Sequence, residues 1–223
     1  MATAKRKKIL LVSAIGKAVW PWVNRPDTKY EADGVYRMKI AVDPSDAKQW
    51  AKAQQMVEQI DAALAGIVAK QREETGKKKV KVFDLPYKME KDDADEETGR
   101  LLFSFKLKAK GMTKEKVVYD KTVKLFQANG VPLAKEKIVG GGSTVQASYE
   151  MNAFYTSAAG VSLRLEAVRV LELVEYTGRD AAGYGFDTDD EYGSAADDEE
   201  STGTKDADDE DEDSDEDDDS GAF

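Results

Sequence analysis

The sequence predicts a mainly β fold, in which one α-helix is inserted into a small antiparallel barrel and an acidic tail follows. The barrel is indicated by several segments that alternate apolar and polar residues, separated by Gly, Pro or Asp. The tail is indicated by composition, because residues 187–223 contain twenty Asp or Glu and a single Lys. We therefore expect one folded domain over residues 1–180 and a disordered tail over residues 181–223.

Two strands are predicted in the first part of the chain. Residues 9–12 form a short apolar run, and residues 34–42 alternate apolar and basic side chains until Asp43 ends the strand. Between them, Pro21 and Pro26 predict an irregular segment, because proline lacks the N–H that a strand ladder uses.

A single amphipathic helix is predicted over residues 45–74. Apolar residues recur there at three- and four-residue spacing: Trp50, Ala53, Val57, Ile60, Leu64 and Ile67. Ser45 is suited to cap the helix, Asp46 to its first turn, and Gly76 to its end.

The rest of the body is predicted to be β structure, apart from a solvated acidic loop at residues 90–97. The predicted strands are residues 101–110, 117–119, 123–126, 143–151 and 160–176, with a hairpin turn after Gly111 and a bulge near Ala167. Strands that close on themselves leave no exposed edge, and the five-stranded Greek-key barrel, or OB-fold, is such a closed sheet and binds oligonucleotides. We therefore expect an OB-fold.

The charge of the chain changes sign between body and tail. The whole chain has 33 Lys+Arg and 44 Asp+Glu, so residues 1–186 keep 32 basic and 24 acidic residues, a net +8, and residues 187–223 carry −19. Lysine and arginine are drawn to phosphates and to carboxylate runs alike. The body is therefore expected to bind nucleic acid, and the tail to compete for the same surface.

The composition argues against an enzyme. The chain has no Cys and no His, so the usual nucleophilic thiolate, general base and metal ligand are missing, and we expect no metal or cofactor. It also has no apolar run of the roughly 18 residues that span a membrane. We expect a cytoplasmic protein without a membrane partner.

Aromatic and basic residues form the first candidate binding patch. Trp20 and Trp22 stand close to Arg25, and exposed indoles beside cations suit base stacking with phosphate contact. The alternative for these rings is packing against the barrel end. Phe154 and Tyr155 form a second aromatic pair beside a predicted turn, where rings could reach a groove.

Basic residues on two predicted strands form the second patch. Lys106, Lys108 and Lys110 lie on one strand face at intervals of roughly 7 Å, close to the phosphate spacing of an extended single strand. Arg37 and Lys39 share a face of the strand at 34–42 and join this candidate surface. A merely solvated strand face is the alternative.

An ordered set of segments resembles the single-stranded DNA-binding protein family of T-seven-type bacteriophages. The resemblance runs from Ser13 to Phe223 and rests on Gly34-Val35-Tyr36, Phe103-Ser104-Phe105-Lys106, Ile138-Val139-Gly140-Gly141-Gly142-Ser143 with Tyr149, Gly160-Val161-Ser162-Leu163-Arg164-Leu165-Glu166, and the acidic tail ending in Phe223. It implies an OB-fold that coats single strands without sequence preference and anneals complementary strands in DNA replication, recombination and repair, in the cytoplasm of the infected bacterial host.

The resemblance also implies roles for single residues. Lys106 matches a DNA-contact position, Phe154 an aromatic stacking position, and Trp20 or Trp22 stands near an aromatic of the N-terminal segment. The tail, with Asp217, Asp218, Asp219 and Phe223 at its end, would contact the phage DNA polymerase and primase-helicase and support a homodimer. The chain departs from the family pattern at Thr144, Gln146 and Ser148, where the best-known member is lysine-rich, and at Lys108, which replaces an aromatic.

Two alternatives to this function remain open from the sequence. An acidic-tailed chaperone of basic proteins would share the tail and the strand-rich body, but would bind partners through the tail. An RNA-binding OB protein would differ only in accepting a 2′-hydroxyl, which no residue here decides.

Overall fold

The computed structural model describes residues 8–76, 79–92 and 94–175 of the 223-residue chain. The acidic tail and its predicted disorder lie outside the described residues.

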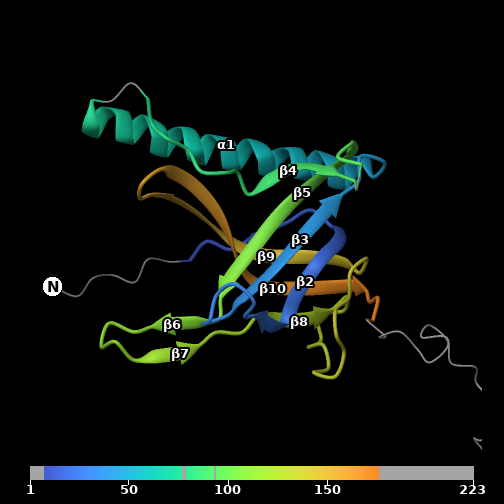
Figure 1. The fold of residues 1–223 in the computed structure, drawn as a ribbon. Helices are drawn as coiled ribbons and strands as arrows, with labels where there is room; N and C mark the ends of the chain where they lie inside the picture. Colours follow the sequence, from blue (N-terminus) through green and yellow to red (C-terminus); the bar gives the residue numbers. More distant parts are fainter. Residues whose placement is uncertain (1–7, 77–78, 93, 176–223) are drawn as a thin grey trace, which may run out of the picture. The chain divides into compact units, whose positions relative to one another are not determined.

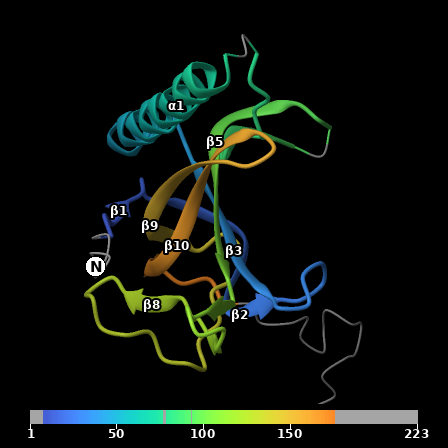
Figure 2. The same cartoon turned by 90° about the vertical axis from the view of Figure 1, so that its left-hand side faces the viewer.

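Five long strands of the described body close into a ring (Figures 1 and 2). They are β2 (Gly16–Asp27), β3 (Val35–Val42), β5 (Glu97–Lys108), β9 (Thr144–Tyr155) and β10 (Ala159–Glu172). The hydrogen-bonded order is β2–β3–β5–β10–β9 and back to β2, with every pair antiparallel except the parallel pair β5–β10. This closed five-stranded barrel is the predicted OB-fold.

Shorter strands extend this barrel. They are β1 (Leu11–Val12) on β9, β4 (Tyr87–Lys91) on β5, β8 (Lys124–Gln127) on β10, and the separate hairpin of β6 (Lys110–Met112) and β7 (Val118–Asp120). The hairpin after Gly111 was predicted, and so was the bulge of β10, which appears as a register shift between Leu165 and Ala167.

The helix α1 (Ala47–Thr75) runs across one end of the barrel and packs against β3, β9 and β10 (Figure 1). Asp46, not the predicted Ser45, is its N-cap, because the Asp46 carboxylate accepts from the backbone N–H groups of Lys48 and Gln49, both at 3.1 Å. Gly76 ends the helix as predicted, in the left-handed conformation at φ 65°. Within the described ranges, no helix is long and apolar enough to cross a membrane.

The barrel interior is filled by the inward-facing residues of each strand. Phe103, Phe105 and Leu107 of β5 alternate with the exposed Lys106 and Lys108. Tyr149 of β9 is also buried, with its ring edge-on to Phe105 at 5.3 Å between centroids, so it belongs to the core.

The segment around Pro21 is predicted from the sequence to be irregular, but in the structure it is a strand. It lies within β2, whose pairing with β3 shifts register between Val19 and Trp22 and again between Trp22 and Asp27. A bulge takes the proline out of the regular ladder, so the missing N–H costs no strand hydrogen bond.

The predicted solvated loop at residues 90–97 is confirmed in its middle, where residues 92 and 94–96 are exposed and connect β4 to β5, whereas residues 90, 91 and 97 belong to these two strands. The Asp92 carboxylate accepts from the backbone N–H groups of Ala94 and Glu96, both at 2.9 Å, and this fixes the turn. The strand β4 has too few alternating residues to be recognised alone and forms because β5 supplies its partner.

The ends of two predicted strands also differ from expectation. The strand β5 ends at Lys108, so Lys110 lies in β6. Phe154 and Tyr155 lie within β9 and not in a connecting segment, because β9 and β10 remain paired as far as Tyr155 and Ala159.

Candidate nucleic-acid interface

A groove of about 810 Å³ lies on the outer face of β2, β3, β5 and β10. Asp84, Leu85 and Pro86 line it beside these strands. We call it the first groove. Its basic residues are Arg37, Lys39, Lys106, Lys108, Lys121 and Arg164, and its acidic residues are Glu31 and Asp84.

Four side chains of this groove form a row across the sheet. Trp22 on β2 is the register partner of Arg37 on β3, and Arg37 is the partner of Lys106 on β5. Lys106 is in turn paired with Arg164 on β10. Like charges directly opposite each other destabilise a sheet, so three adjacent cations favour anions beside them. The row is therefore suited to bind phosphates.

The two arginines of the row are held by carboxylates. Arg37 is paired with the buried Asp27, and Arg164 with Glu150 and Glu166. No described carboxylate lies within ion-pair distance of Lys106 or Lys108, the two lysines of the same face of β5. The groove thus combines two positioned guanidinium groups with two lysines free to contact a ligand.

Lys39 reports the positive potential of this surface. Burial lowers the pKa of its ammonium group, and the charges of Lys88, Arg37 and Lys106 lower it further. A bound phosphate would offset this repulsion, so the charged form of Lys39 is stabilised when an anion occupies the groove.

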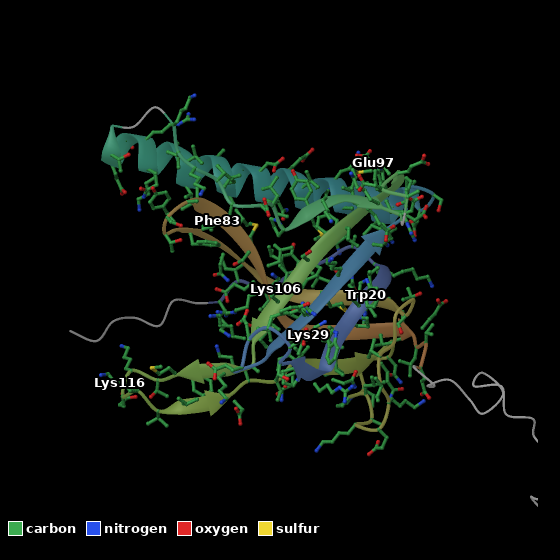
Figure 3. All side chains as sticks on the ribbon, viewed as in Figure 1. Trp20, Lys29, Phe83, Glu97, Lys106 and Lys116 are labelled. Carbon is green, nitrogen blue, oxygen red and sulfur yellow. The ribbon has the colours of Figure 1, made fainter. Side chains whose placement is uncertain are left out.

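Exposed aromatic rings border the cations. Trp20 is 76% exposed, and Figure 3 shows it over β2, with Lys106 over the neighbouring strands. Tyr30, at the tip of the β2–β3 hairpin, is equally exposed, with the Lys29 ammonium 5.2 Å from its ring centroid. Such rings offer faces on which bases can stack.

The second aromatic pair is divided between the two faces of the β9–β10 hairpin. Phe154 packs over Gly160, its register partner, and lies 6.0 Å from Phe83 between centroids. It shares its strand face with Asn152, which lines the first groove, whereas the exposed Tyr155 follows on the opposite face.

The structure brings together part of the residue set predicted from the sequence. Trp20, Trp22, Arg37, Lys39, Lys106 and Lys108 line the first groove. Four predicted residues do not line it: Lys110, Arg25, Phe154 and Tyr155. Lys110 pairs instead with Asp33 at 3.4 Å, and the Arg25 guanidinium lies 5.5 Å from the centroid of the Trp22 ring.

Sequence reasoning missed three cations of this surface. Arg164 lies between buried residues of a predicted strand, so the alternating pattern could have shown that it faces outward. Lys88 lies on β4, which was not predicted, and Lys121 follows the β6–β7 hairpin, whose position relative to β5 only the fold shows.

An OB barrel with cations in register beside exposed rings defines a class of protein, the binders of single-stranded nucleic acid. Comparison with known proteins leads to the same class. The family model described as single-stranded DNA-binding protein of bacteriophage T7 matches residues 15–173. The chain therefore belongs to this family of phage single-stranded DNA-binding proteins, as the resemblance in its sequence predicted.

The chain is also similar to proteins of solved structure. The gp2.5 single-stranded DNA-binding protein of bacteriophage T7 superposes with a TM-score of 0.63 at 25% identity, covering 80% of this chain and 94% of that one. The single-stranded DNA-binding protein of bacteriophage Enc34 superposes with a TM-score of 0.48 at 12% identity, covering 78% and 88%. No curated protein matches the chain.

Proposed function

We propose that the first groove binds single-stranded DNA without sequence preference, and that the protein acts in phage DNA replication, recombination and strand annealing in the cytoplasm of the infected host. The observation that carries this proposal is the row formed by Trp22, Arg37, Lys106 and Arg164. The family of the chain supports it.

The row suggests how a strand is held. Neighbouring strands of a sheet lie about 4.8 Å apart, so the three cations are close enough together for one phosphate to contact two of them. Bases can then turn toward the exposed rings of Trp20 and Tyr30. Stacking tolerates any base, because every base has a π-face, and this agrees with binding that is independent of sequence.

The acidic tail has a separate role in this proposal. Its −19 charge competes with DNA for the +8 body, and DNA displaces it. The displaced tail, with Asp217, Asp218, Asp219 and Phe223, recruits the phage DNA polymerase and primase-helicase, and the protein works as a homodimer. The family resemblance supports these partners, and the charge asymmetry supports the competition.

Charge reversal at Lys106 tests the DNA groove. Lys106→Glu should weaken binding of oligo-dT by at least about tenfold and reduce the salt dependence, since one phosphate contact is lost and a repulsive charge is added. Lys106 is exposed, so the variant should fold. Quenching of tryptophan fluorescence at several salt concentrations measures both quantities.

Lys70→Glu is the matched control, because Lys70 is an exposed lysine on α1 and does not line the groove. Its affinity should stay within about twofold of the wild type, the small change expected from long-range charge alone. Equal affinities of both variants would show that strands bind elsewhere. A parallel titration with oligo-U shows whether the groove also accepts RNA.

A further inference from the structure

A second groove of about 780 Å³ lies beside the first and has no role in the function proposed above. It is formed by part of β2 and by the glycine-rich segment at residues 138–142. Trp20 and Trp22 line both grooves, so the two indoles stand between them.

The ridge between the grooves has an unusual backbone. Trp20 has a φ of 51°, a left-handed conformation that a bulky residue adopts only when its surroundings impose it. The surroundings here are the register shift of β2 between Val19 and Trp22. Strain of this kind is characteristic of binding sites, and its result is a ring that stays 76% exposed.

The opposite wall of the second groove is bare. A Cβ atom placed on Gly141 would have the Ala18 carbonyl oxygen, at 4.0 Å, as its only neighbour within 4 Å, and one placed on Gly142 would have none. The wall is also fixed, because the Asn24 amide accepts from the Val139 N–H at 2.9 Å and donates to the Lys137 carbonyl at 2.8 Å. Flat apolar groups can therefore enter without rearrangement.

One cation stands in this apolar groove. The Arg25 guanidinium lies 5.5 Å from the Trp22 ring centroid and has no ion-pair partner among the residues that the structure describes. A guanidinium beside an indole can contact the phosphate of a nucleotide whose base lies against the ring.

We propose that the second groove binds nucleobases of the same DNA strand after the strand passes Trp20, so that the binding site continues along β2. This inference rests on the proposed function of the first groove. Continuity through Trp20 and Trp22 favours DNA as the occupant. A single arginine offers little to a tail with twenty carboxylates.

Filling the second groove tests the proposal. Gly141→Leu places a side chain into the open space, and binding of the full-length variant is measured with (dT)₅ and (dT)₁₅, lengths near the two ends of the range of one OB-fold. We expect at least about fivefold weaker binding of the long oligonucleotide, the contribution of one stacked base, and unchanged binding of the short one. Gly66→Leu on exposed α1, where a Cβ atom also meets nothing, should change neither affinity.

Each other outcome overturns the subsite. Equal loss for both lengths would mean that the leucine disturbs the first groove, and no loss for either would mean that the second groove is empty of DNA. A loss that disappears in the Phe223→Ala background would identify the tail of the protein as the occupant. The wild type and Lys106→Glu are measured in parallel. The proposed function itself would fail if the wild type did not bind the oligonucleotides, or if Lys106→Glu bound them as tightly as the wild type.

Discussion

At the scale of single residues, Trp20 combines an exposed ring with a strained backbone. Its φ of 51° costs about 1–2 kcal/mol for a residue with a Cβ, and its ring buries little surface in return. Stability alone would favour glycine at this position. An exposed tryptophan at this position agrees with the proposed stacking of a base on its ring.

A pair of substitutions separates strain from binding. Trp20→Gly should be more stable than Trp20→Ala by about 1 kcal/mol, because glycine adopts positive φ without a steric cost, and both variants should bind oligo-dT equally weakly. Urea unfolding and fluorescence-independent binding, such as anisotropy of a labelled oligonucleotide, measure the two effects. At the neighbouring Val19, whose φ is not positive, the order of stability should reverse, so that Val19→Ala is more stable than Val19→Gly. Greater stability of Trp20→Ala would show that no strain is stored.

Single residues also show what the sequence can predict about the site. Lys106 and Lys108 were predicted because strand alternation alone decides their face. Lys110 was assigned to the same row by that alternation, but β5 ends before it. Arg164 lies next to Lys106 through a parallel pairing of segments nearly sixty residues apart, and no local pattern contains that information.

At the scale of elements, α1 and β3 could be predicted almost to their ends, because the hydrophobic period is long and uninterrupted in both. The strand β2 was missed because its two prolines argue against a strand, and the bulges that accommodate them depend on the partner strand. The strand β4 was missed because it is short and polar, and β5 stabilises it.

The contact between β5 and β9 makes a prediction about alkaline pH. Burial against Phe105 raises the pKa of Tyr149 from 10.0 to about 12. Between these values the unfolded chain loses the phenolic proton while the folded protein keeps it, so stability present below pH 10 is lost as the pH rises toward 12. The loss amounts to roughly 2–3 kcal/mol.

Tyr149→Phe should remove this component. Its free energy of unfolding, from urea titrations, should fall less than that of the wild type between pH 10 and 12. Tyr30→Phe, at a 75% exposed position, should follow the wild type throughout. If Tyr149→Phe also follows the wild type, the buried phenol does not contribute to the alkaline loss of stability.

At the scale of the whole molecule, the proposed competition between tail and DNA can be measured directly. Deleting residues 201–223 removes twelve of the twenty acidic residues of the tail and should tighten binding of oligo-dT at low salt, with a smaller effect at high salt, where charges are screened. Titrations of both chains at several salt concentrations measure the effect.

A full-length variant with the acidic residues of positions 206–219 replaced by Asn and Gln is the control for length. It should behave like the deletion, because charge and not chain bulk is the competitor. Unchanged affinity of the deletion at low salt would contradict the competition and leave the tail with recruitment alone.

If DNA binds as proposed, the row of Trp22, Arg37, Lys106 and Arg164 also determines when a newly made chain can first bind it. Its members come from four strands, and Arg164 lies on β10, the last strand of the barrel. The same strand closes the ring through β5 and β9. A chain still on the ribosome, or one cut short before β10, therefore has neither a complete row nor a closed barrel. Unfinished copies would thus not compete with finished ones for exposed single strands.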